Sequence, residues 1–102
     1  MRDYIFIGSG PACEDVAQVG SEGYAERGKK ECRALINQLK RMHGEPPENT
    51  SFSIKPCPHD FGTYYEVICY FESEDEKSVD YAYGCEDLPE FWDEEARKEL
   101  ME

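Results

Sequence analysis

The sequence predicts a single α+β domain: a small antiparallel sheet of about three strands, packed on one face by one long amphipathic helix and followed by one or two short helices. Apolar residues alternate in three short segments, and an apolar repeat of helical period runs from residue 21 to residue 42. A chain of 102 residues has room for one hydrophobic core. We therefore treat residues 1–102 as one globular domain with an acidic C-terminal segment over residues 85–102.

Residues 3–8 (DYIFIG) alternate as a short strand does and lead into a glycine-rich loop. The Gly-x-Gly start is typical of dinucleotide-binding enzymes, but Cys13 stands where that motif needs its third glycine. The chain is also too short for the repeated βαβ sheet of those enzymes. Gly8 and Gly10 therefore predict a tight turn rather than a nucleotide site, with a single helical turn near residues 14–18.

The segment 21–42 predicts the long helix, with Ser21 as its N-cap and Gly44 as its stop. One side of this helix is expected to face the core, and the opposite side is basic. That basic side is interpreted as a solvated face partly paired with the acidic half of the chain, with a binding surface as the alternative. The expected core positions are Gly28, Cys32, Leu35, Ile36, Leu39 and Met42, and the basic residues are Lys29, Lys30, Arg33, Lys40 and Arg41.

Residues 51–56 and 63–71 predict two more strands, which flank a short loop and should pair as an antiparallel hairpin. In the second strand, Tyr65, Val67, Cys69 and Phe71 share one face, which we expect to meet the long helix.

Residues 74–83 favour a helix that opens with the capping-box pattern of Ser73 to Glu76 and ends at Gly84. A strand is the alternative, because Val79, Tyr81 and Tyr83 also alternate. The helical interpretation buries Val79, Ala82 and Tyr83. The tail predicts a short docked helix with Pro89 in its first turn and a stripe of Trp92, Ala96 and Leu100.

The loop between the hairpin strands, CPHDFG, brings three chemically capable residues close in sequence: Cys57, His59 and Asp60. We interpret them as turn residues. Two alternatives stay open, a thiol–imidazole pair and half of a zinc site completed by Cys13 or Cys85. No closely paired Cys-x-x-Cys ligands are present, so we expect no metal. Cys57 and His59 lie two apart on an extended segment and do not face each other, so we expect no catalytic residue, and we expect no cofactor.

The five cysteines and the apolar runs bear on the compartment. An odd number of unclustered cysteines, with Cys32 and Cys69 on expected apolar faces, suits reduced thiols. No run is long enough to span a membrane, and no basic region with a long apolar segment opens the chain. We therefore expect a cytoplasmic protein without membrane contact.

The charge is uneven along the chain. The net charge is −12, and residues 66–102 alone hold fourteen Asp and Glu against three Lys and Arg. Such clusters beside aromatic residues suit a basic groove, and a solvated surface without a partner is the alternative. The expected binding surface comprises Glu72, Glu74, Asp75, Glu76, Glu86, Asp87, Glu90, Trp92, Asp93, Glu94 and Glu95.

Two segments, DVAQVGSEGYAERGKKECRALINQLKR (15–41) and KPCPHDFGTYYEVICYF (55–71), resemble short uncharacterised proteins encoded on bacterial phages, plasmids and integrative elements. The resemblance covers residues 4–85 and carries no function. It implies an origin in a bacterial or phage cytoplasm and slightly favours a role against host machinery. It also indicates that QVGSE and PHDFGTYYE matter for the shared fold or site.

Together these features predict a non-enzymatic acidic protein that binds a basic protein, in one version as a nucleic-acid mimic that occupies the groove of a defence or regulatory protein. The alternatives are a metal- or thiol-dependent protein centred on the CPHDFG loop, and an acidic housekeeping domain of no specific activity. Because a charge of −12 opposes approach to phosphates, we expect no direct nucleic-acid binding. The sequence leaves the oligomeric state open.

Overall fold

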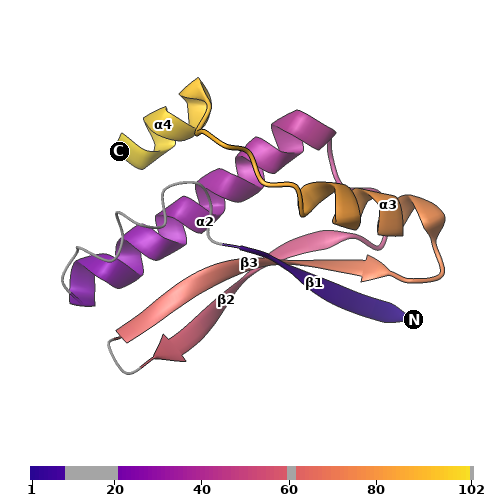
Figure 1. Ribbon diagram of the computed structural model, residues 1–102, viewed down its shortest axis with the longest axis horizontal. Coiled ribbons are helices and arrows are strands. Elements are labelled where there is room, and N and C mark those ends of the chain that lie inside the picture. Colours follow the sequence, from indigo (N-terminus) through magenta and orange to yellow (C-terminus); the bar gives the residue numbers. More distant parts are fainter. Residues whose placement is uncertain (9–20, 60–61, 102) are drawn as a thin grey trace.

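The computed structural model describes residues 1–8, 21–59 and 62–101. Within these residues one antiparallel sheet of three strands has all three helices on the same side, two of them against the sheet and the last one against the long helix (Figure 1), so the α+β class is confirmed. The helix α2 has 23 residues, whereas α3 has ten and α4 has eight. The elements in chain order are β1 (Arg2–Gly8), α2 (Ser21–His43), β2 (Ser51–His59), β3 (Gly62–Glu72), α3 (Glu76–Cys85) and α4 (Glu94–Met101).

The sheet has the order β1-β3-β2, and β3 runs antiparallel to both of its neighbours. The strands β1 and β2 are therefore parallel to each other and are joined through α2, which makes a split βαβ unit. The hairpin of β2 and β3 is confirmed, but β2 continues past residue 56 to His59. As an edge strand it tolerates Pro56 and Pro58, because the missing N–H groups need not serve a second neighbour.

The core lies between α2 and the sheet. Leu35 and Leu39 of α2 are fully buried, and they share a cluster with Val67, Cys69 and Phe71 of β3. At Gly28 an added Cβ would lie 3.2 Å from Cδ2 of Tyr65, so the small residue lets the helix approach the sheet closely. The apolar face expected for β3 is thus the face that meets the helix. None of the described helices combines the length and apolar character that crossing a bilayer requires.

Two features of α2 differ from the expectation. Met42 is 49% exposed, because α2 rises away from the sheet toward its C-terminal end (Figure 1). Ala34 and Gln38 are buried instead, because α4 and the segment before it pack on a second flank of α2. The stop at Gly44 is as predicted: its φ is +86°, and its N–H donates to the Lys40 carbonyl over 2.8 Å.

The acidic half forms two helices, so the strand alternative for residues 74–83 is wrong. Asp75, not Ser73, caps α3 by accepting the Lys77 N–H, and Tyr83 lies exposed while Ser78 is buried. In the tail, α4 starts only at Glu94. Pro89 therefore lies outside the helix, and the predicted first-turn position was wrong. The helical turn expected near residues 14–18 falls outside the described residues.

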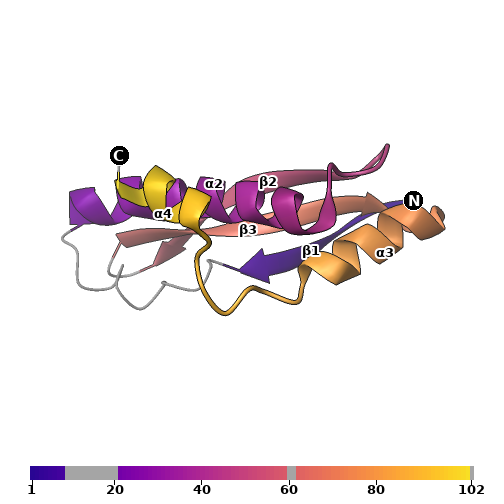
Figure 2. The same cartoon turned by 90° about the horizontal axis from the view of Figure 1, so that it is seen from above.

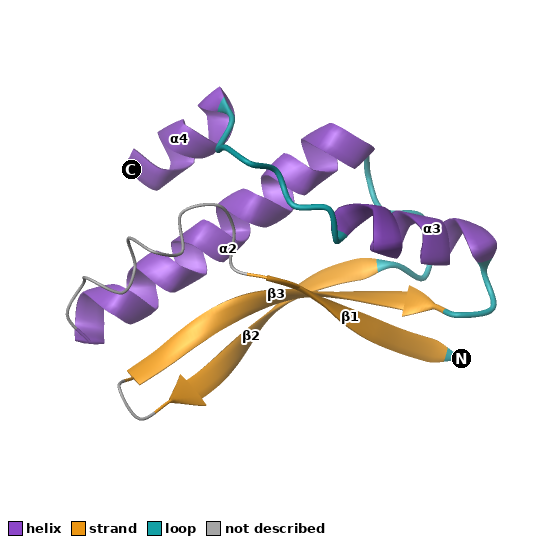
Figure 3. Ribbon diagram, in the orientation of Figure 1, coloured by secondary structure: helices purple, strands orange, loops and turns teal. Residues whose placement is uncertain are grey.

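The two sides of the sheet are unequal. Seen from above, the helices extend along the sheet on the same side (Figure 2), and no described helix or loop covers the other side (Figure 3). Directly paired residues share a face, so the register identifies the uncovered one. We call this uncovered side the open face; it consists of Arg2, Tyr4, Phe6, Ser51, Ser53, Lys55, Glu66, Ile68, Tyr70 and Glu72.

Candidate functional site

The acidic residues of the second half lie mainly on the helical side of the sheet. They occur on α3, on the connection that follows it, and on α4, and these three segments succeed one another along the molecule (Figure 1). Because the acids are spread over these successive segments, they form an extended band rather than a compact cluster. The predicted residues divide into those that build the fold and those that face solvent.

Asp93 belongs to the fold. Its carboxylate accepts Nη2 and Nε of Arg41 at 2.7 and 3.0 Å, and its Oδ1 also accepts the Ala96 N–H at 2.8 Å, which caps α4. The Arg41 guanidinium is the main reason why the pKa of Asp93 lies below its usual value, and Asp93 in turn raises the pKa of Arg41. The expected pairing of the basic helix with the acidic half is therefore present at Arg41.

Glu72 and Asp75 also have structural roles. Glu72 binds the α-ammonium group of Met1, which lowers the pKa of this carboxyl group and raises that of the ammonium. Asp75 is occupied as the N-cap of α3. Both residues are consequently less available to a partner than their position in the sequence suggested.

The remaining predicted acids face solvent. Glu94 and Glu95 lie 3.9 Å from the Nζ of Lys98, a separation at which exposed ion pairs contribute little, and Glu74 lies 3.6 Å from the Met1 ammonium. The other four make no ion pair with another described residue. We call this set the acidic helical surface: Glu74, Glu76, Glu86, Asp87, Glu90, Glu94 and Glu95.

Asp80 is a further acid of this surface that was not among the predicted site residues. It lies exposed on α3 and adds a carboxylate to the same band. In a strand Asp80 would share a face with Ser78 and Ala82, whereas in a helix it lies on the opposite side from these two buried residues. Its exposure therefore could not be predicted while residues 74–83 could be either.

The most exposed aromatic side chain among these acids is Phe91 and not the predicted Trp92. Trp92 is half-buried and packs against the core, whereas Phe91 is 78% exposed between Glu90 and Asp93. The backbone explains the difference, because the Phe91 carbonyl accepts Gln38 Nε2 at 3.1 Å and the Asp93 N–H donates to Gln38 Oε1 at 3.1 Å. These bonds fix the connection with Trp92 directed inward and Phe91 outward.

The basic side of α2 faces α4 over part of its length. The amide of Asn37 donates to Glu99 over 2.6 Å, beside a polar hollow of about 250 Å³. Lys30 and Arg33 line the same hollow. Farther toward the N-terminus of α2, the Lys29 ammonium lies 5.4 Å from the centroid of the Tyr65 ring. Several of these basic groups thus contribute to packing within the molecule.

In the described residues of the CPHDFG loop, the Cys57 thiol bonds to the backbone and no metal site is formed. Cys57 is half-buried on β2, and its thiol donates to the Lys55 carbonyl over 3.8 Å. His59 ends β2, and Asp60 falls outside the described residues. No group of three or more His, Cys, Asp or Glu in the described part of the chain is arranged to hold a metal ion.

The other described cysteines are core residues, as expected for Cys32 and Cys69, and Cys85 joins them. Burial raises the pKa of Cys32 and of Cys85 to about 12 and that of Cys69 to about 11. These thiols stay protonated at neutral pH and are poor nucleophiles. Cys13, the other proposed zinc partner, lies outside the described residues.

Comparison with known proteins adds no family: no protein-family model, curated protein or solved structure matches this chain. Any function must therefore be argued from the surface itself.

Proposed function

We propose that this chain is a non-enzymatic binding protein whose acidic helical surface engages a basic protein. In its most concrete version the partner is a nucleic-acid-binding protein of a bacterial host, and the chain occupies the groove that otherwise holds a phosphate backbone. The observation that supports the proposal is the set of exposed carboxylates on α3, α4 and their connection, most of them without an ion-pair partner among the described residues.

Phe91 supports the same proposal. A phenyl ring that is 78% exposed contributes little to the fold but offers apolar contact area within a charged surface. Interfaces often combine one such anchor with surrounding charges that steer association. We therefore assign Phe91 the role of anchor and the carboxylates the role of steering.

A pull-down with the purified chain as bait, at about 50 mM and about 500 mM NaCl, tests the proposal, because screening shortens the range of charge attraction from about 14 to about 4 Å. We expect a basic protein to be captured at low salt and lost at high salt. Excess duplex DNA should release it if the chain acts as a mimic. Absence of a basic partner at low salt, or capture that ignores salt, contradicts the proposal.

Two double variants make the test specific. Glu94→Gln/Glu95→Gln removes two charges from the acidic helical surface, and Glu45→Gln/Glu48→Gln removes two from the exposed turn between α2 and β2. Both bring the net charge from −12 to −10. Capture should fall with the first variant and persist with the second. Equal effects would show that total charge, and not the surface, determines binding.

A further inference from the structure

The open face carries a continuous group of aromatic rings. The centroids of Tyr4 and Phe6 on β1 lie 5.8 Å apart, and Tyr4 lies 6.0 Å from Tyr70 on the adjacent strand β3. Tyr4 is 50% and Phe6 49% exposed, while the neighbouring Ile68 is buried. Exposed rings that are not needed to close a core are typical of a binding surface.

Two cations lie over these rings from either side. The Arg2 guanidinium carbon is 4.7 Å from the Tyr70 ring centroid, and Lys55 Nζ of β2 is 5.2 Å from that of Phe6. The acids of the face are Glu66 and Glu72, and Glu72 already binds the Met1 ammonium. In a chain of net charge −12 the open face is thus close to neutral.

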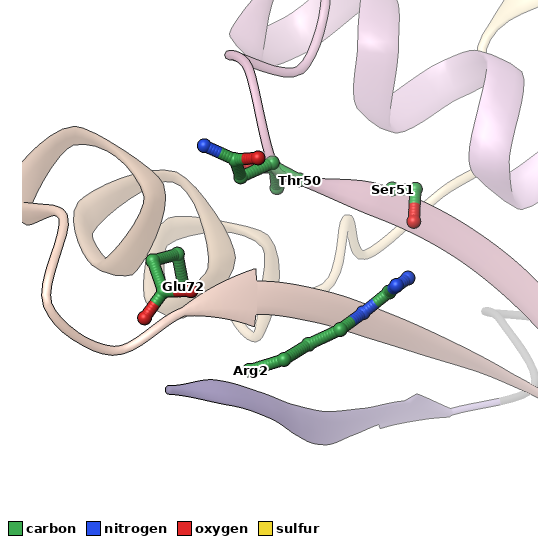
Figure 4. A pocket seen from close by; sticks show the side chains of 5 residues that line it. Arg2, Thr50, Ser51 and Glu72 are labelled. Carbon is green, nitrogen blue, oxygen red and sulfur yellow. The ribbon is translucent and has the colours of Figure 1, made fainter.

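A polar hollow of about 300 Å³ lies at one end of the sheet (Figure 4). Arg2 both lines this hollow and lies over Tyr70, so the hollow and the ring group are continuous. The other lining residues are Asn49, Thr50, Ser51 and Glu72, which offer hydrogen-bond donors and acceptors. Ser78 fixes two of these walls: its hydroxyl lies 2.6 Å from that of Thr50 and accepts the Glu72 N–H over 2.8 Å.

We propose that the open face binds a short single-stranded nucleic acid. Unpaired bases stack on Tyr4, Phe6 and Tyr70, the phosphates approach Arg2 and Lys55, and the edge of one base hydrogen-bonds in the hollow. Rings on adjacent strands of an uncovered antiparallel sheet suit unpaired bases, because every base has a flat apolar face while a duplex keeps its bases stacked inside.

The proposal departs from the expectation that this chain makes no direct nucleic-acid contact. That expectation rested on net charge and on the basic side of α2, whereas the acids of the helical side lie across the sheet from the open face. Stacking does not depend on charge, so the contacts proposed here are made by the rings of the open face and not by the acidic helical surface.

Fluorescence anisotropy of labelled oligo(dT) and oligo(U), each of about ten nucleotides, titrated with the full chain tests the proposal. We expect saturable binding, with Tyr4→Ala and Phe6→Ala each weakening it about tenfold. With about two phosphates contacted, log K should fall with log[salt] with a slope of about −1.4, and Lys55→Gln should reduce that slope by about 0.7. Comparison of the two oligonucleotides shows whether the 2′-hydroxyl is recognised.

Two controls make the result specific to this face. Phe91→Ala removes an exposed ring from the helical side and should leave oligonucleotide affinity unchanged. The thermal unfolding midpoint of each variant should stay close to that of wild type, because the half-exposed rings are not needed for folding. Absence of binding by wild type, equal loss with Phe91→Ala, or equal affinity for a duplex of the same length would overturn the proposal.

A second copy of this chain is the rival occupant of the open face. Light scattering after size-exclusion chromatography identifies that case: a dimer that Phe6→Ala converts to a monomer, without oligonucleotide binding, contradicts the nucleic-acid proposal. A monomer that binds the oligonucleotide supports it.

Discussion

The two sides of one sheet in this chain have opposite characters. The helical side holds the core and most of the negative charge, while the open face holds exposed rings and balanced charge. Strand β3 shows the contrast within a few residues, since Val67, Cys69 and Phe71 are buried against the helices and Glu66 and Tyr70 of the other face remain partly exposed. The net charge of a small domain therefore does not describe the charge of each of its surfaces.

The difference also separates two kinds of binding energy. Contacts made by the acidic helical surface depend on charge and should weaken steeply with salt. Contacts made by the rings of the open face depend mainly on stacking and burial, and the two phosphate contacts at Arg2 and Lys55 add a limited salt dependence. Substitutions on each side of the sheet test this distinction.

Leu35→Ala should have the largest effect on stability. Leu35 is fully buried between α2 and the sheet, so its removal leaves a cavity and should cost about 2–5 kcal/mol of the free energy of unfolding. Phe6→Ala removes a larger side chain from the open face but should cost less than about 1 kcal/mol. Urea denaturation of both variants measures the difference. Comparable losses would mean that the open face is part of the core.

Ser78→Ala should cost about 1–3 kcal/mol, because it leaves the partly buried Glu72 N–H and the Thr50 hydroxyl without this partner. Ser78 lies where the end of β3, the start of α3 and the strand β2 meet, so it couples the helical side to the hollow. Denaturation gives the cost, and Ser78→Thr, which keeps a hydroxyl, serves as the comparison. A loss below about 0.5 kcal/mol in Ser78→Ala would show that this hydroxyl bond is not significant.

Asp93→Asn should cost about 1–2 kcal/mol at neutral pH, because it removes the ion pair with Arg41 and weakens the cap of α4. The pKa of Asp93 is lower in the folded chain than its usual value of 3.8. Its contribution is therefore complete above about pH 4 and is lost as the pH falls through the folded pKa. The difference between wild type and variant should shrink in that acidic range.

Glu90→Gln is the matched control for Asp93→Asn. Glu90 is an exposed acid of the same connection and makes no ion pair with another described residue. Its stability should match that of wild type within about 0.5 kcal/mol at all pH values. A pH-dependent loss in Glu90→Gln would contradict the division into structural and solvent-facing acids.

Local patterns were sufficient to predict much of the fold. The alternation in residues 63–71 and the repeat from Cys32 to Leu39 reflect burial on one face of one element, and both were confirmed. Positions that depend on a third element were missed. The sequence pattern places Gln38 on the polar surface, but the connection before α4 packs on it and buries it. The pattern places Met42 in the core, but the C-terminal end of α2 leaves the sheet and exposes it.

The candidate site was harder to predict, because the type of a residue does not show whether its side chain points to solvent or into the fold. Asp93 and Glu94 carry the same charge, yet Asp93 forms an ion pair with Arg41 whereas Glu94 is exposed. The same holds for Phe91 and Trp92, which the bonds of Gln38 turn in opposite directions. Tyr70 was visible as part of an alternating strand, but only the location of all described helices on one side identifies its face as open.

The smallest effect tests the two surfaces against each other. Glu94→Gln/Glu95→Gln lowers the repulsion that an anionic strand meets on approach, so the association rate of oligo(dT) at low salt should rise about two- to threefold. The same variant should bind a Lys/Arg peptide of about ten residues more weakly by a similar factor, because attraction is lost. Stopped-flow fluorescence at low and high salt measures both rates. Opposite signs at low salt that converge at high salt are the expected result, whereas a loss in both would place the strand and the basic peptide on the same surface.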